Sequence, residues 1–213
     1  NQQRPEIALS LERPGPSMVR RRGLQILRGS GVALSLMLIS ACAAPPLATF
    51  DLSAPTVQAK ARQMRAILVV QEPIASAPLD GDRIVVRVGG TSIAVVKGAQ
   101  WADRLPRLLQ NRLIQTFENA QLTRSISRPG DGIAADRSLA WEIRRFEVQT
   151  EEAAARVEVS VKILDPSGRV VAAQIFSASA PGSAGEGAAA SAALNEASND
   201  VLRQIVAWAS SRL

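Results

Sequence analysis

The chain has 213 residues, of which 46% are hydrophobic, with one cysteine, no histidine and no tyrosine. Its net charge of +6 is uneven: residues 1–41 carry six arginines and two glutamates, whereas residues 42–213 carry only +2. The chain lacks the clustered cations and stacking aromatics of a nucleic-acid surface, so nucleic-acid binding is not expected. Because it has no histidine, it can have neither an imidazole base nor a His-containing zinc site.

The first 41 residues have the pattern of an export signal. The arginines at 20–22 and 28 precede a short apolar run over residues 31–41, and small side chains come before the expected cleavage point. As a helix, this eleven-residue run spans roughly 17 Å, well short of the ~30 Å hydrocarbon core of a bilayer. We therefore predict a signal peptide over residues 1–41, with Met18 as the true start.

Cys42 ends a sequence that matches a lipobox, formed by Ile39, Ser40 and Ala41 before it. Small residues admit the peptide to a signal peptidase, and the thiol is the strong nucleophile that accepts the lipid. Two alternatives stay open. Ala41-Cys42-Ala43 also fits an ordinary small-x-small cleavage site, and Cys42 can instead be a core residue of a domain that starts earlier.

Residues 42–64 contain Pro-rich stretches and no steady period, which predicts a lipidated N-terminus followed by an extended tether. The domain is then expected over residues 65–213. Its first strands are predicted at 66–70, 83–88 and 92–96, the last two joined as a hairpin by Gly89-Gly90.

Residues 101–121 have helical periodicity, with one apolar stripe and one polar face. Pro106 is compatible with a helix that begins near Ala102 or Asp103, because the first-turn N–H groups have no intrahelical acceptor. The stripe consists of Trp101, Leu105, Leu108, Leu109, Leu113 and Phe117.

The remaining segments alternate with period two, then return to helical spacing. A strand over 139–148 changes phase at Arg144-Arg145, which predicts a bulge, and residues 157–163 alternate strictly. A turn at 165–168 leads to a strand over 170–176. Residues 178–193, rich in Ala, Gly and Ser, are expected to be a flexible crossing or a weak helix start before a final amphipathic helix over 194–208.

These elements predict an α+β fold: a mostly antiparallel sheet of about five to six strands, with two amphipathic helices packed on one face. An enzyme is not expected. No phosphate-binding glycine loop is present. The acidic candidates for carboxylate chemistry read as surface charge, since two flank Gly81 in a turn and the other two fall on strand positions expected to face solvent. They are Asp80, Asp82, Glu142 and Glu147.

Several segments, taken in order, resemble the auxiliary lipoproteins of ABC-type transporters, in particular the PqiC-like component of MCE lipid-transport systems. After Cys42 these segments are Thr49–Pro55, Leu68–Pro73, Gly98–Leu109 with its Trp followed by Leu-Pro, and Val206–Trp208. The order and spacing of these segments carry the resemblance, since each alone is common.

The resemblance implies a periplasm-facing lipoprotein that works with an MCE-family protein, a permease and an ATPase to move lipids between two membranes. It implies no catalysis, no metal and no cofactor. Trp101, Leu105 and Pro106 then have two possible roles, a partner-contacting patch or the seating of the helix on the sheet.

Two other functions are kept open, a structural lipoprotein that assists assembly of an outer-membrane machine and a lipid-anchored hydrolase using carboxylates. Homo-oligomerisation also stays open. An Asp directly after the lipidated cysteine favours retention in the inner membrane, and this chain has Ala43 there. The expected location is therefore the periplasmic side of the outer membrane.

Overall fold

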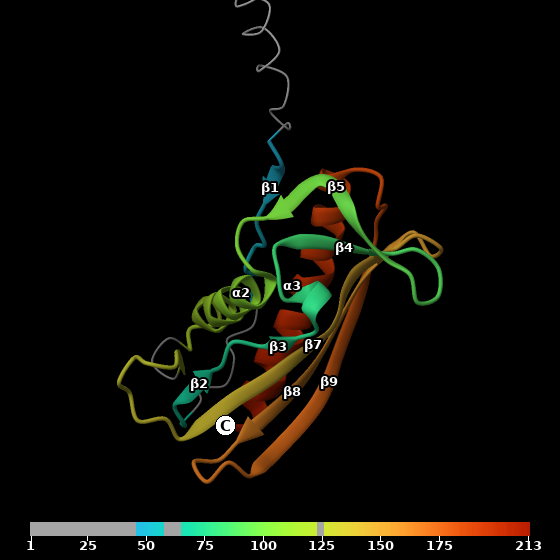
Figure 1. Ribbon diagram of the computed structural model, residues 1–213. Coiled ribbons are helices and arrows are strands. Elements are labelled where there is room, and N and C mark those ends of the chain that lie inside the picture. The colour runs from blue at the N-terminus through green and yellow to red at the C-terminus, as the bar shows by residue number, and fades with distance from the viewer. Residues whose placement is uncertain (1–45, 58–64, 123–125) are drawn as a thin grey trace, which may run out of the picture. The chain divides into compact units, whose positions relative to one another are not determined.

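The computed structural model describes residues 46–57, 65–122 and 126–213 (Figure 1). Within these ranges, nine strands form a single sheet, and one of the two α-helices, α3, runs behind β7, β8 and β9 in the view of Figure 1. The strands are β1 (Ala48–Phe50), β2 (Leu68–Val70), β3 (Ile74–Ala75), β4 (Arg83–Arg87), β5 (Ile93–Trp101), β6 (Ile126–Ser127), β7 (Arg137–Gln149), β8 (Ala154–Leu164) and β9 (Val170–Pro181). The α+β class agrees with the sequence prediction, but the sheet has more strands than expected.

The expectation of a mostly antiparallel sheet is wrong, because the sheet is mixed. Its longest strand, β7, pairs antiparallel with β8 along one side and in parallel with β2, β3 and β4 in succession along the other. The sequence prediction assumed hairpins between neighbouring strands. Here helix α2 (Leu105–Asn119) separates β5 from β6 and β7, and a helical connection lets later strands run parallel to earlier ones.

Helix α2 begins at Leu105, later than the expected Ala102 or Asp103. Pro106 lies in the first turn, where its missing N–H costs no helical hydrogen bond. Trp101 is the last residue of β5 instead of the first helical residue, and its N–H donates to the Asp82 carbonyl at 2.7 Å. The apolar stripe of α2 is buried as its periodicity predicted.

The predicted bulge in β7 is confirmed by a shift in the pairing with β8 between Ile143 and Arg145. Before the shift, Trp141 and Ile143 face the core, and after it Phe146 and Val148 do so. The bulge thus keeps one apolar face over thirteen residues. The alternation of β8 is also confirmed, with Val157, Val159, Val161 and Ile163 at most 1% exposed.

Residues 178–193 were expected to be a flexible crossing or a weak helix start; the helix start is confirmed from Gly187, and the flexible crossing is wrong. Strand β9 continues to Pro181, and helix α3 (Gly187–Arg212) begins soon after it. The Ala- and Ser-rich composition suits close packing of α3 against the sheet. Trp208 at the far end of α3 makes an edge-to-face contact with Phe176 of β9, with ring centroids 5.5 Å apart.

The tether expected over residues 42–64 needs correction for residues 48–57, which belong to the domain. Strand β1 pairs in parallel with the end of β5 through Ala48–Ala99 and Phe50–Trp101. Leu52 is only 3% exposed, and the Ser53 N–H donates to Asn195 Oδ1 of α3 at 2.7 Å. Hydrogen bonds and burial together bind this segment to both the sheet and α3.

Candidate functional site

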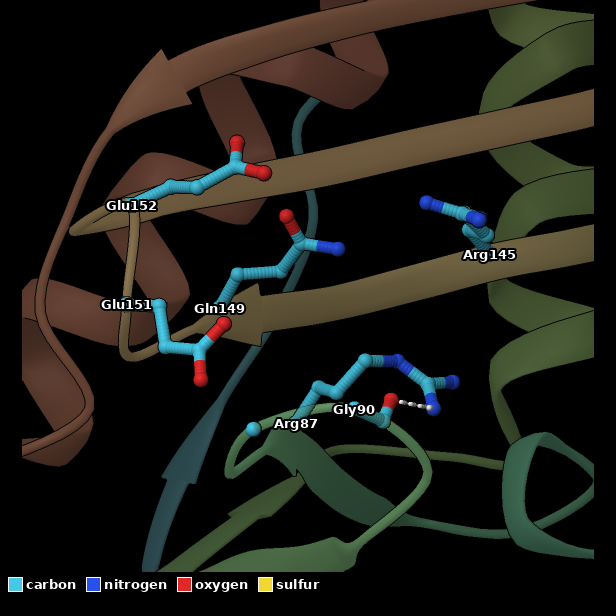
Figure 2. A pocket seen from close by; sticks show the side chains of 7 residues that line it. Arg87, Gly90, Arg145, Gln149, Glu151 and Glu152 are labelled. Carbon is cyan, nitrogen blue, oxygen red and sulfur yellow. Dashed lines mark hydrogen bonds between the residues drawn. The ribbon is translucent and has the colours of Figure 1, made fainter.

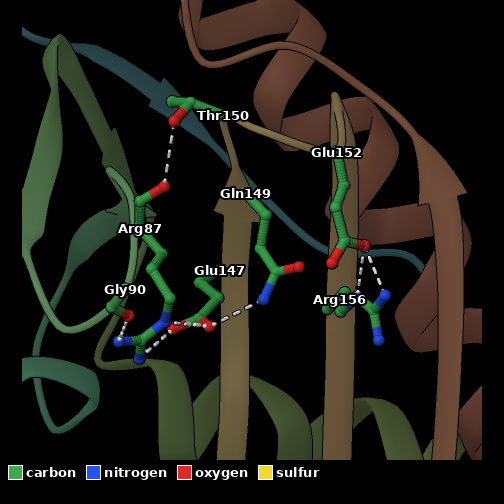
Figure 3. A network of polar contacts seen from close by, with 7 residues as sticks. All are labelled: Arg87, Gly90, Glu147, Gln149, Thr150, Glu152 and Arg156. Carbon is green, nitrogen blue, oxygen red and sulfur yellow. Dashed lines mark hydrogen bonds and ion pairs between the residues drawn. The ribbon is translucent and has the colours of Figure 1, made fainter.

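A buried ion pair joins β4 to the end of β7. Arg87 Nε donates to Glu147 Oε1 at 2.6 Å, and a second guanidinium nitrogen donates to Glu147 Oε2 at 2.8 Å (Figure 3). The Glu147 side chain is 2% exposed and that of Arg87 is 28% exposed. Such a two-pronged contact between a guanidinium and a carboxylate is both strong and directional.

Glu147 was expected to face solvent, and that expectation is wrong. The bulge in β7 does put Glu147 on the face opposite Phe146 and Val148, but β4 pairs alongside and brings Arg87 over the carboxylate. The hydrogen bonds to Glu147 raise the pKa of Arg87. Both oxygens of Glu147 thus accept hydrogen bonds from the same guanidinium.

A polar cavity of about 350 Å³ opens next to this pair, between the β4–β5 turn and the β7–β8 turn (Figure 2). Gln149 is only 9% exposed. Its side-chain nitrogen donates to Glu147 Oε1 at 3.5 Å, and this contact orients the amide (Figure 3). Its oxygen points away from Glu147 and has no hydrogen-bond partner among the residues that the structure describes. The lining residues are Arg87, Gly89, Gly90, Arg145, Gln149, Glu151 and Glu152.

The charges around the cavity are of both signs. Arg145 lies on one side and the carboxylates of Glu151 and Glu152 on the other (Figure 2), and Glu152 is paired with Arg156. Among the described residues, the lining includes no serine, threonine, cysteine or lysine. The arrangement can hold a small polar group through hydrogen bonds and charge.

The other acidic candidates are dispersed and paired with arginines. Asp80 forms an ion pair with Arg104, and the Asp82 carboxylate lies 3.8 Å from Arg83. Glu142 is half exposed in the middle of β7, away from Glu147 at the strand's end. The structure therefore places Glu142 and Glu147 apart on β7 and gives each of these four carboxylates an arginine neighbour. Within the described ranges, no group of three acidic or cysteine side chains is placed to hold a metal ion.

A second cavity, of about 340 Å³, lies where β3 meets β7 and β8. Its wall includes Ile74, the most exposed large apolar side chain of the described domain at 69%, together with Glu142 and Ser160. The register places Ile74, Glu142, Ser160 and Ile175 in one row across β3, β7, β8 and β9. Sequence periodicity did not indicate this row, because it depends on which strands become neighbours.

Trp101, Leu105 and Pro106 all lie inside the domain. Trp101 and Leu105 are 1% exposed and Pro106 is buried. The Trp101 ring makes an edge-to-face contact with Phe146, with centroids 5.9 Å apart. These positions suit the seating of α2 on the sheet. Cys42 and the lipobox residues Ile39, Ser40 and Ala41 lie outside the described residues.

Sequence reasoning missed Arg87, Arg145 and Gln149 as a group. A usable signal was present in the predicted bulge, since the phase change at Arg144-Arg145 puts Arg145, Glu147 and Gln149 on one face of β7. What was missing was the neighbour on that side. The parallel partner β4 supplies Arg87 from sixty residues earlier in the chain.

Comparisons with known proteins point to one group. A protein of Bradyrhizobium diazoefficiens with no assigned function is 33% identical over 162 residues, which cover 75% of this chain and 44% of that protein. This chain thus spans less than half the length of that relative. A crystal structure of a Xanthomonas campestris protein has a TM-score of 0.68 at 28% identity, covering 78% of this chain and 96% of that one.

A second crystal structure, of an uncharacterized protein, shares the fold with a TM-score of 0.54 at 16% identity, covering 78% of this chain and 95% of that one. The family model described as the ABC-type transport auxiliary lipoprotein component matches residues 49–206, from β1 into α3. That range takes in the cavity and the Arg87–Glu147 pair. The chain belongs to the family of ABC-type transport auxiliary lipoproteins.

Proposed function

We propose that the protein is a lipid-anchored, periplasm-facing subunit of an MCE-type ABC transport system that moves lipids between the inner and outer membranes. The family match across nearly the whole folded domain carries this proposal. The domain acts by binding and coupling, alongside an MCE-family protein, a permease and an ATPase that supply the pore and the energy. Residues 1–41 are its signal peptide, and Cys42 carries the lipid.

A role without catalysis is supported by the chemistry of the described domain. Several of its carboxylates are paired with arginines, as in Arg87–Glu147 and Arg104–Asp80, and the described lining of the polar cavity includes no serine, threonine, cysteine or lysine. Auxiliary subunits of a transporter need binding surfaces more than reactive groups. Among the described residues, no helix has the length and apolarity to cross a bilayer.

Strand β9 offers a surface for coupling. Among the described strands it pairs with β8 alone, so its other edge can present main-chain donors and acceptors to a partner strand. All twelve residues of β9 are uncharged, and Val170, Val171 and Ile175 are 50–54% exposed. Natural sheets normally protect such an edge with charge, so an uncharged edge favours strand addition by a partner.

Native lipoprotein recovered from membranes tests the partnership. We expect an MCE-family protein, a permease and an ATPase to be captured with it and identified by mass. Ile175→Lys should reduce that capture by charging the edge of the sheet, while Ile133→Lys is the matched control, since Ile133 is equally exposed at 51% in a loop. Capture of secretion or pilus components in their place would support the assembly role and contradict lipid transport.

The anchor is tested at Cys42, the sole thiol of the chain. Cys42→Ala removes the acyl-accepting sulfur, so labelling by a fatty-acid probe in cells should disappear. Some cleavage by the ordinary signal peptidase can persist through Ala41 and Ala43. Continued labelling of the alanine variant would contradict the lipoprotein assignment.

Membrane fractionation tests the location. With Ala43 after the lipidated cysteine, we expect most of the protein in the outer-membrane band. The substitution Ala43→Asp should shift it toward the inner-membrane band. Recovery of the unaltered protein mainly from the inner membrane would contradict the proposed sorting.

A further inference from the structure

The β4–β5 hairpin carries apolar side chains that face solvent. Val88, Ile93 and Val95 are 46–47% exposed around the Gly89-Gly90 turn. The connection between β4 and β5 projects at the right of Figure 1. In an ordinary surface hairpin these positions are polar, so the exposed apolar side chains indicate a contact outside the domain.

The charge of the hairpin restricts what that contact can be. From Arg83 to Trp101 the chain has three basic residues and no acidic residue. Ile93, Val95 and Lys97 alternate along β5 and therefore share one face of the strand. Lys97 has no ion-pair partner among the described side chains. Apolar groups beside a free ammonium suit the interface of an anionic lipid bilayer.

Acidic groups also lie near the hairpin, and they are held close to the protein. Glu152 is paired with Arg156, and Glu147 with Arg87. Glu151 lies against the turn, where a side chain in place of the Gly89 hydrogen would come within 3.0 Å of its carboxylate. The stripe of Ile93, Val95 and Lys97 carries no acidic member.

The position of β1 supplies an independent argument. Because β1 pairs in parallel with the end of β5, the chain that precedes Ala48 leaves toward the start of β5, where Ile93 and Val95 lie. From residue 42 to residue 48 the backbone can span at most about 22 Å. The stretch of β5 from Ile93 to Ala99 covers about 20 Å, so a lipid on Cys42 is tethered within reach of the hairpin.

We propose that the β4–β5 hairpin rests in the lipid headgroup region next to the acylated Cys42, with Val88, Ile93 and Val95 in the interface and Lys97 on anionic phosphates. This inference rests on the lipid anchor of the proposed function. The hairpin gives the domain a second membrane contact and a fixed orientation. The opposite end of the sheet, where β7 starts at Arg137, then points about 40 Å away from the bilayer.

A probe on the hairpin tests this geometry in the acylated, full-length protein. Acylation consumes the Cys42 thiol, so Thr91→Cys introduces a unique thiol in the exposed turn for an environment-sensitive fluorophore. The protein is reconstituted into vesicles of phosphatidylethanolamine and phosphatidylglycerol that carry nitroxide-labelled lipids. We expect quenching of more than half the emission. The control Ala134→Cys, in the exposed loop before β7, should be scarcely quenched.

Substitutions then show whether the apolar side chains are responsible. Ile93→Ser with Val95→Ser should abolish the quenching at position 91, and Lys97→Glu should weaken it on anionic vesicles more than on phosphatidylcholine vesicles. The matched control is Val170→Ser with Val171→Ser, which removes side chains of similar exposure at the far end of the sheet. Circular dichroism verifies that each variant is folded.

Flotation of the same vesicles separates the two levels of the proposal. If the protein fails to float, the anchor is absent and the hairpin inference falls with it. If it floats but the probe at position 91 is not quenched, the anchor stands and the hairpin inference is overturned. A blue-shifted, unquenched probe whose signal fades on dilution would assign the hairpin to contact with a second copy and would also overturn the inference.

Discussion

At the scale of single residues, the most consequential side chain is Glu147. Its carboxylate is nearly inaccessible, and its charge is balanced by Arg87, whose side chain bridges β4 and β7 and also reaches the Gly90 carbonyl at 3.3 Å. A buried carboxylate that keeps its partner is tolerated, whereas one that loses it is costly to desolvate. The pair thus fixes the wall of the polar cavity.

Arg87→Ala should therefore destabilise the domain by about 3 kcal/mol or more, because it leaves the Glu147 carboxylate buried without its cation. Urea unfolding followed by circular dichroism measures the change. Arg104→Ala is the control, since Arg104 pairs with Asp80 at the surface and its loss should cost much less than the loss of Arg87. Equal losses of stability in the two variants would show that the Arg87–Glu147 pair stabilises the domain no more than a surface ion pair does.

Asp165 determines the acid behaviour of the β8–β9 turn. The Ser167 hydroxyl donates to its carboxylate at 2.6 Å and the Arg169 N–H at 3.0 Å, and these bonds lower the pKa of Asp165 to about 2. The unfolded chain takes up this proton near pH 3.8. The contribution of ionised Asp165 to the free energy of unfolding is therefore complete above that pH, and it is lost as the pH falls toward about 2.

Ser167→Ala removes the hydrogen bond that contributes most to this lowered pKa. We expect the pKa of Asp165 to rise toward its ordinary value and the pH window of the stability loss to narrow. A carboxyl NMR titration of the two proteins reports the pKa directly. An unchanged titration in the Ser167→Ala protein would mean that the backbone N–H groups suffice.

At the scale of elements, the joint between β9 and α3 depends on the close approach of backbone to side chain. A Cβ on Gly182 would lie 2.4 Å from the Ala193 Cβ, and one on Gly187 would lie 2.6 Å from the Ala99 Cβ. Both distances are far inside van der Waals contact, and both neighbours are short side chains that cannot rotate away. Helix α3 therefore sits on the sheet at a separation that only glycine permits.

Gly182→Ala should destabilise the domain by about 1–3 kcal/mol, because α3 must shift to admit the methyl group. Gly185→Ala is the matched control in the same connection, since nothing lies within 4 Å of its added Cβ. Thermal unfolding of both variants makes the comparison. Equal melting temperatures for the two would refute the tight joint.

At the scale of the whole molecule, residues 48–57 are part of the domain. Leu52 is buried, Ser53 is bound by Asn195 and Asn199 of α3, and Asn119 of α2 donates to the Pro55 carbonyl at 3.1 Å. This segment is thereby fastened to both helices and, through β1, to the sheet.

A variant that lacks residues 1–42 should remain as stable as the intact domain, while one that lacks residues 1–57 should lose about 2–5 kcal/mol, the cost of removing a buried leucine together with the β1–β5 pairing. Urea unfolding of the two purified proteins tests this. If both unfold at the same urea concentration, residues 48–57 do not contribute to the stability of the domain. The proposal that a lipid on Cys42 is held close to the hairpin would then lose its support.

The sequence by itself determined the features that depend on near neighbours. Strict alternation located β8, the phase change located the bulge in β7, the apolar stripe located α2, and turn chemistry located the β4–β5 hairpin and the β8–β9 turn. The order of short motifs indicated the family. The signals for strands, helices and turns each lie within about twenty residues, where backbone geometry sets the spacing of the side chains.

Only the tertiary structure decided which strands became neighbours. The parallel pairing of β4 with β7 brought Arg87 to Glu147, and the pairing of β1 with β5 turned an expected tether into part of the sheet. Burial of Glu147 and exposure of Ile93 and Val95 follow from the same arrangement. These contacts join residues far apart in the chain, and their energies are set by burial and charge pairing, which no local period records.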